Sequence, residues 1–193
     1  MSKQLFIASS KEGLTYANAL KDRLNEEFEF QQFDVKCLLW TDYGASRGGC
    51  STLETLQDLS DSVSYAVAMI TPDDTANIRG VSCCIPRDNV VFEFGLFLGK
   101  LSRLKVFAVI PNAGIPSVPD LRIPSDLFGI TNARYEYKLD ADIVWAKDTL
   151  REAVTMIIRW IAKFERPTLA RRPKSSSSDE FDNNMISFRT YPM

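Results

Sequence analysis

One carboxylate, Glu93, lies in the middle of a segment that is otherwise apolar on nearly every side, residues 89–100. A helix that is hydrophobic on every side is typically buried. An ionised carboxylate in such a helix loses its hydration, and only a partner, a ligand or a raised pKa can offset that loss. The residues just before it indicate the helix start, because Asp88 or Asn89 can cap free N–H groups and Arg87 can pair with a carboxylate or an anion. We therefore expect a polar pocket at the mouth of a buried helix.

The sequence contains no histidine. This absence excludes the Ser-His-Asp triad, the Cys-His dyad, imidazole general bases and His-ligated zinc. Any catalysis must use carboxylates, thiols, lysines or hydroxyls. The four cysteines, at positions 37, 50, 83 and 84, form no C-x-x-C pair, and we expect free thiols. We predict neither a metal nor a cofactor.

Length and composition limit the remaining classes. With 193 residues and 45% hydrophobic composition, the chain can form one domain, which we place at residues 1–165, followed by a flexible tail at 166–193. With a net charge of −2, the chain has no excess of positive charge that would attract nucleic acid or an anionic membrane, so neither is an expected partner. The apolar stretches are far shorter than a bilayer span and the N-terminus lacks a signal-peptide core, so we expect a cytoplasmic protein.

Strand and helix patterns alternate along the chain. Short apolar runs predict strands at residues 4–8, 34–40, 65–70, 105–110 and 134–137. Helical spacing predicts helices at residues 14–27, 52–62, 89–100 and 141–164, whereas residues 41–51 and 71–88 read as loops. Such alternation predicts a parallel sheet with helices on both faces.

In sheets of this kind, ligands bind at the carboxyl ends of the strands, near a topological switch point. Ser9 and Ser10 follow the first predicted strand, Trp40 and Asp42 lie at the end of the second, and the 71–88 loop follows the third. We therefore expect these polar groups to converge on one edge of the sheet.

Five segments, in this order, resemble a known family: Leu5-Phe-Ile-Ala-Ser-Ser-Lys-Glu-Gly13, Leu39-Trp-Thr-Asp42, Ile70-Thr-Pro-Asp-Asp74, Pro86-Arg-Asp-Asn-Val-Val-Phe-Glu-Phe-Gly-Leu-Phe97 and residues 121–129. The chain resembles the bacterial TIR-like nucleotide-binding domains, NAD-cleaving effectors of anti-phage systems, over roughly residues 4–160. The resemblance implies a flavodoxin-like α/β fold with a five-stranded parallel sheet. It also implies NAD⁺ glycohydrolase activity that gives nicotinamide and ADP-ribose or a cyclic form.

The resemblance assigns the catalytic role to Glu93. Nicotinamide is a cationic leaving group, so the ribose gains oxocarbenium character, which a nearby carboxylate stabilises without any histidine acid. At the matching positions the family contacts the nucleotide through Ser9 and Ser10. Trp40 is a candidate for stacking on a base.

Asp42 is a candidate for orienting that base, and Arg87, beside Asp88, is a candidate for holding a phosphate or for pairing with Asp88 or Glu93. Self-association usually completes the site in this family, here around residues 41–51, and a sensor domain or protein responding to a nucleotide signal is the other expected partner.

Two alternatives stay open. The first is a non-catalytic TIR scaffold that signals through homotypic contacts. The second is a nucleoside deoxyribosyltransferase-like enzyme, which also places a carboxylate beside an anomeric carbon but exchanges bases on deoxynucleosides. Several binding residues also have a structural explanation: Ser9 and Ser10 could simply shape a helix N-terminal turn, Trp40 could cover the core, and Arg87 could be an ordinary ion-pair residue.

Overall fold

The computed structural model describes residues 2–44, 52–115, 119–125 and 131–165. Within these ranges, strands and helices alternate as the hydrophobic pattern predicts. The elements are β1 (Lys3–Ser9), α1 (Leu14–Phe30), β2 (Val35–Leu39), α2 (Trp40–Gly44), α3 (Thr52–Ser62), β3 (Tyr65–Met69), β4 (Asp74–Ile78), β5 (Val81–Ile85), α4 (Asp88–Leu101), β6 (Val106–Pro111), β7 (Thr131–Tyr135), α5 (Ile143–Thr149) and α6 (Arg151–Ile161).

Five of the strands form one parallel sheet in the order β2-β1-β3-β6-β7. Counting only the strands of this sheet, the order is 2-1-3-4-5, which is the flavodoxin-like arrangement with its switch point between β1 and β3. Near-continuous apolar runs such as β3 and β6 are buried along their whole length, as strands covered on both faces must be. The predicted fold class is confirmed.

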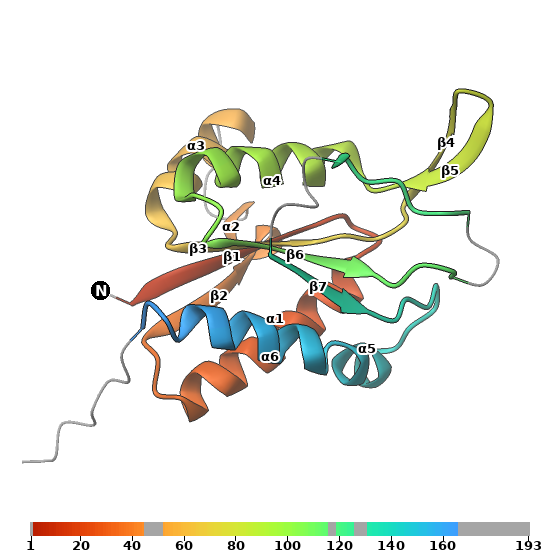
Figure 1. Ribbon diagram of the computed structural model, residues 1–193. Coiled ribbons are helices and arrows are strands. Elements are labelled where there is room, and N and C mark those ends of the chain that lie inside the picture. Colours follow the sequence, from red (N-terminus) through yellow and green to blue (C-terminus); the bar gives the residue numbers. More distant parts are fainter. Residues whose placement is uncertain (1, 45–51, 116–118, 126–130, 166–193) are drawn as a thin grey trace, which may run out of the picture.

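Two helical layers cover the sheet, as Figure 1 shows. On one face, α1, α5 and α6 bury a large core that includes Tyr16, Tyr135 and Ile157. On the other face, α3 and α4 bury a smaller core around Phe6, Phe94 and Phe97. Alternate residues of each strand enter opposite cores because successive side chains point to opposite faces.

The stretch 71–88, which we expected to be a loop, contains a β-hairpin. Strands β4 and β5 pair antiparallel through a tight turn at Arg79 and Gly80, both with positive φ, and the hairpin projects from the end of the domain (Figure 1). Positive φ at both central residues is the geometry of a type I′ turn, which suits a two-residue hairpin. The prediction of an irregular loop was wrong because these strands are short and only partly buried, so their hydrophobic alternation is weak.

Three further boundaries differ from the predictions. The second strand ends at Leu39 and Trp40 already begins helix α2. The last strand lies at Thr131–Tyr135 instead of residues 134–137, and the predicted helix at 141–164 is interrupted at Leu150 between α5 and α6. The predicted tail at 166–193 lies outside the described residues.

Helix α4 is buried on one side only. Val90, Phe94 and Phe97 pack into the smaller core, whereas Phe92 is 56% exposed and Gly95 and Gly99 face solvent. The expectation of a helix buried all round was therefore wrong. Hydrophobic residues occupy both sides of α4; one side packs on the sheet and a neighbouring side faces α3, whereas Phe92 remains exposed.

Candidate functional site

The carboxyl ends of β1 and β2 are joined by a hydrogen bond between two predicted site residues. Trp40 Nε1 donates to Ser9 Oγ at 3.2 Å. Ser9 is buried at the last position of β1, while the Trp40 side chain remains 37% exposed at the first position of α2. The hydrogen bond fixes the indole orientation and leaves part of the ring available to a ligand.

Ser10 connects the carboxyl ends of β1 and β3. Its Oγ lies 3.1 Å from Thr71 Oγ1 and accepts a hydrogen bond from Gly13 N at 2.9 Å, at the start of α1. A Cβ on Gly13 would lie only 3.0 Å from Thr71 Oγ1, so the glycine is needed for this close approach. Ser10 is 4% exposed, so its structural role in shaping the turn is well supported.

Arg87 is held by carboxylates other than those we expected. Its guanidinium pairs with Glu12 at 2.7 Å and with Asp74 at 3.1 Å. These contacts tie the residue before α4 to the β1–α1 connection and to the hairpin. The predicted pairing of Arg87 with Asp88 or Glu93 was wrong, because the guanidinium extends toward the carboxyl edge of the sheet whereas α4 runs away from that edge.

Asp73 is a site residue that the sequence analysis did not single out. Its Oδ2 accepts a hydrogen bond from Arg87 N at 3.1 Å, and its Oδ1 is buried without a hydrogen-bond partner. Burial raises the pKa of Asp73, although hydrogen bonds from neighbouring groups oppose that rise. Its position just after the third strand, at the ligand-binding edge of the sheet, was the signal that could have identified it.

Glu93 is partly buried on the second turn of α4, and its Oε2 is buried without a hydrogen-bond partner. Burial raises the pKa of Glu93 to about 7, and no charged neighbour contributes to that shift. A buried carboxylate oxygen without a hydrogen-bond partner among the described residues makes Glu93 a candidate functional group. The expected perturbation of Glu93 is therefore present, and its cause is loss of hydration.

The spacing along α4 shows which way Glu93 points. Lys100 lies seven residues further along and therefore on nearly the same side of the helix. Because Lys100 pairs with Asp61 of α3, this side of α4 faces α3. Glu93 therefore faces the region where α3 begins, just after residues 45–51, which lie outside the described residues.

The remaining two predicted residues lie at the margin of this region. Asp42 Oδ2 accepts hydrogen bonds from Lys21 Nζ at 2.6 Å and Leu39 N at 2.9 Å. Burial opposes ionisation of Asp42, but these hydrogen bonds outweigh it and its pKa is lowered. Asp88 is exposed at the first position of α4, where its Oδ1 accepts only from Asn89 N, so the predicted capping by Asp88 or Asn89 does not occur.

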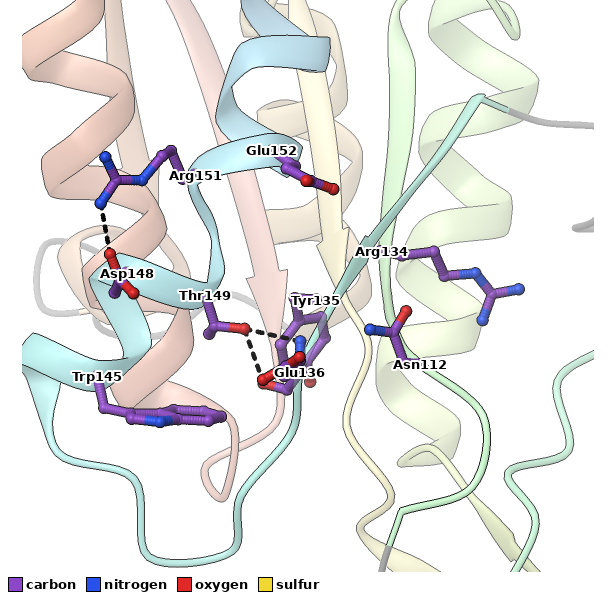
Figure 2. A pocket seen from close by; sticks show the side chains of 9 residues that line it. All are labelled: Asn112, Arg134, Tyr135, Glu136, Trp145, Asp148, Thr149, Arg151 and Glu152. Atoms are coloured by element: carbon purple, nitrogen blue, oxygen red, sulfur yellow. Dashed lines mark hydrogen bonds and ion pairs between the residues drawn. The ribbon is translucent and has the colours of Figure 1, made fainter.

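A separate pocket of about 340 Å³ lies between β7 and helices α5 and α6, on the face of the sheet opposite α4 (Figure 2). Its polar lining includes Arg134, Trp145 and Glu152, and Thr149 Oγ1 bonds to the backbone of Glu136 across it. No sequence motif singled out these residues, and Glu93 is not among them.

No group of His, Cys, Asp and Glu side chains among the described residues is arranged to hold a metal ion. No described helix is long and apolar enough to cross a membrane.

The family model described as CAP12/Pycsar effector protein, TIR domain, matches residues 4–137 of this chain. This chain belongs to that family. The match contains Glu93 and every other predicted binding residue, so the family resemblance of the sequence is confirmed.

Curated relatives agree with the family match. CD-NTase-associated protein 12 of Sphingobacterium faecium is 38% identical over 136 residues, covering 70% of this chain and 37% of the relative. Pycsar effector protein PaPycTIR of Pseudomonas aeruginosa is 36% identical over 141 residues, covering 73% of this chain and 42% of the relative. The TIR chain matches less than half the length of these relatives. Among solved structures, the flavodoxin-like domain of a Synechococcus protein is 10% identical with a TM-score of 0.44, covering 83% of this chain and 99% of that one.

Proposed function

We propose that this TIR domain is an NAD⁺ glycohydrolase of anti-phage defence and that Glu93 is its catalytic carboxylate. The observation that carries the proposal is the state of Glu93: it is partly buried, has an oxygen without a hydrogen-bond partner, and has a pKa raised to about 7. Membership of an effector family supports the biological setting. The unpartnered oxygen supports a functional role because a structural carboxylate would be expected to have satisfied oxygens. The raised pKa supports it because perturbed pKa values cluster at functional sites.

The reaction would break the bond between nicotinamide and ribose C1′. The bonding electrons leave with nicotinamide, which departs as a neutral molecule, and positive charge develops on the ribose ring. An ionised Glu93 stabilises this charge, and water then adds to C1′ to give ADP-ribose and release one proton. A site that removes the carboxylate from water strengthens this electrostatic stabilisation.

Other residues would position the substrate. The exposed part of the Trp40 ring offers a face for stacking on nicotinamide or adenine, and Ser9 fixes that ring. Asp42 holds the start of α2 through Leu39 N and thereby supports Trp40. Ser10 shapes the turn at which a nucleotide would approach.

Arg87 is better suited to positioning than to binding phosphate. Two carboxylates, Glu12 and Asp74, already neutralise its guanidinium. A phosphate would have to displace them, whereas the existing contacts hold the start of α4 and so the placement of Glu93. Asp73 supports the same junction through Arg87 N.

Regulation would come from assembly and from a signal. Self-association of TIR domains around residues 41–51 would complete the site beside Glu93. The curated relatives are longer than this chain and their names associate them with a CD-NTase or with Pycsar, so we propose a nucleotide-responsive sensor as the partner. NAD⁺ is a substrate in this account, and no cofactor is needed.

Nicotinamide release from NAD⁺ by concentrated protein tests the proposal, with light scattering used to follow assembly. Glu93→Gln preserves the side-chain shape and removes the charge. Glu152→Gln, an exposed change on α6, is the matched control because it removes the same charge from the opposite helical layer. We expect release by the wild type and the control and a loss of about a hundredfold or more with Glu93→Gln.

Two results would contradict the proposal. Assembled wild-type protein that releases no nicotinamide would favour the scaffold alternative. Base exchange on deoxynucleosides without NAD⁺ cleavage would favour the deoxyribosyltransferase alternative.

A further inference from the structure

Asp73 has one oxygen whose role the contacts within the domain do not explain. Its Oδ2 accepts a hydrogen bond from Arg87 N, which ties the end of β3 to the start of α4. Its Oδ1 is buried and has no hydrogen-bond partner among the described residues. Glu93 is the other described carboxylate with such an oxygen. An unsatisfied buried acceptor is rare in native structures, so Oδ1 requires a reason beyond the structural contact.

Hydroxyl groups lie near the carboxylate of Asp73. Burial raises the pKa of Asp73, whereas the hydroxyls of Thr71 and Ser10, which lie 3.1 Å from each other, favour its charged form. Burial also raises the pKa of Tyr137, and the nearby charge of Asp73 adds to that rise. These groups follow β1, β3 and β7, so they gather at the carboxyl ends of the strands, beside the switch point between β1 and β3.

Asp73 and Glu93 lie toward opposite faces of the sheet, near its carboxyl edge. Tyr137, the neighbour of Asp73, stacks on Tyr16 with 5.6 Å between ring centroids and packs against the core of the α1, α5 and α6 layer. Glu93 belongs to α4, which covers the other face (Figure 1). An elongated ligand that crosses the carboxyl edge can therefore contact both carboxylates. A dinucleotide has this form, because a pyrophosphate joins its two riboses.

We propose that Asp73 binds the 2′,3′-diol of the adenosine ribose and thereby selects NAD⁺ over NADP⁺. This inference rests on the proposed NAD⁺ cleavage, in which Glu93 takes the ribose of nicotinamide. A carboxylate accepts hydrogen bonds from hydroxyls, and an acidic side chain binds the ribose 2′-hydroxyl in the dinucleotide sites of other open α/β sheets. Asp73 is partly exposed as a residue, and a small rotation about its broad χ2 torsion brings Oδ1 to the ligand.

The charges around Asp73 disfavour a 2′-phosphate. The Arg87 guanidinium lies nearby, but Glu12 and Asp74 already pair with it at 2.7 and 3.1 Å. These contacts leave an excess of negative charge beside the proposed ribose site. NADP⁺ carries a phosphate in place of the 2′-hydroxyl, which removes a hydrogen-bond donor and adds negative charge next to a carboxylate. The contact thus loses its attractive part and gains a repulsive one.

Nicotinamide release from NAD⁺ and from NADP⁺ by the assembled full chain tests this contact. Asp73→Asn keeps an amide oxygen that can accept from Arg87 N, while its NH₂ group takes the place of Oδ1 and the charge is lost. Asp140→Asn is the matched control, because Asp140 is exposed, lies near Tyr137 and carries the same charge. NAD⁺ that lacks the adenosine 2′-hydroxyl tests the same contact in wild-type protein. Thermal unfolding checks that each variant is folded.

We expect kcat/KM of the wild type to favour NAD⁺ over NADP⁺ about a hundredfold. Asp73→Asn should reduce this preference about tenfold or more, chiefly through KM, and should make removal of the 2′-hydroxyl from NAD⁺ almost without effect. Asp140→Asn should change neither result. A wild type that cleaves both dinucleotides equally well, or a preference that Asp73→Asn leaves intact, would overturn the inference while NAD⁺ cleavage itself stands.

Protein that cleaves neither dinucleotide would instead contradict the proposed function. Calorimetric titration of the same proteins with NAD⁺ and with NADP⁺ then tests Asp73 without any need for activity. Tighter binding of NAD⁺ that is lost in Asp73→Asn would support the contact. Equal binding of the two dinucleotides, or binding of neither, would overturn it.

Discussion

The two helical layers of this domain differ in how their buried polar groups are hydrogen-bonded. In the α1, α5 and α6 layer, the buried Tyr16 hydroxyl donates to Lys138 O and accepts from Lys138 N, and the Tyr135 hydroxyl donates to Ile70 O. In the α3 and α4 layer, Glu93 has a buried oxygen with no partner. The first layer therefore pairs the hydroxyls of its buried tyrosines, although Arg23 Nε on α1 also lacks a partner among the described residues, whereas the second layer buries a carboxylate oxygen that has none.

The largest effect on activity should come from the second layer. Glu93→Gln should reduce nicotinamide release about a hundredfold or more, because it removes the charge that stabilises the transition state. Steady-state kinetics on the assembled protein would measure this effect. Activity of the variant within a few-fold of wild type would remove Glu93 from the chemistry.

The largest effect on stability should come from the first layer. Ile157 on α6 is fully buried, and Ile157→Ala should lower the free energy of unfolding by about 2–5 kcal/mol through lost burial and the cavity that remains. Urea denaturation measures this loss. A cost below about 1 kcal/mol would show that α6 is not part of the cooperative core.

Glu93→Gln should stabilise the fold at high pH. The folded-state pKa of Glu93, about 7, lies above its ordinary value of 4.5. The native state of the wild type therefore loses stability as pH rises from about 4.5 through 7, and Gln avoids that loss. We expect a gain of about 1–3 kcal/mol at pH 8 that disappears near pH 4.5.

Glu12→Gln provides a control of opposite sign for this pH dependence. A backbone hydrogen bond and the nearby Arg87 guanidinium lower the pKa of Glu12, so its carboxylate stabilises the native state above its ordinary pKa. This variant should lose stability relative to wild type as pH rises, by an amount reduced by solvent exposure. If the two variants showed the same pH trend in thermal unfolding, the desolvation of Glu93 would be refuted.

Two glycines should respond in opposite directions to the same substitution. Gly13→Ala should cost about 1–3 kcal/mol, because the new Cβ would meet Thr71 Oγ1 at 3.0 Å and Ser10 Oγ at 3.2 Å. Gly99→Ala has open space around it and should add about 0.5–1 kcal/mol through helix propensity. Equal effects in chemical denaturation would show that the turn after β1 is less tightly packed than the structure indicates.

Much of the fold is visible in the sequence because it depends on burial. The predicted helix at 52–62 matches α3 in full, and the apolar runs place the sheet strands to within a few residues. The hairpin was missed because β4 and β5 are partly exposed and carry little periodic signal. The interruption at Leu150 was missed because neither glycine nor proline marks it.

The residues of the candidate site came from the sequence and stay predictions, whereas the contacts that several of them make could not be predicted. An isolated carboxylate in an apolar helix identified Glu93, and the ends of strands identified Ser9, Ser10 and Trp40. The partners of Arg87 lie 75 and 13 positions away in the chain, at Glu12 and Asp74, and long-range ion pairs of this kind leave no local pattern. Asp73 could have been singled out by its place just after the third strand, but its hydrogen bond from Arg87 N could not have been predicted.

The pH dependence of kcat/KM for nicotinamide release tests the central claim most directly. If an ionised Glu93 with a pKa of about 7 is required, kcat/KM should be constant above that pH and fall about tenfold per pH unit below it. A profile that stays level between pH 5 and 8, in protein shown to remain assembled over that range, would contradict the assignment of Glu93 as the catalytic carboxylate.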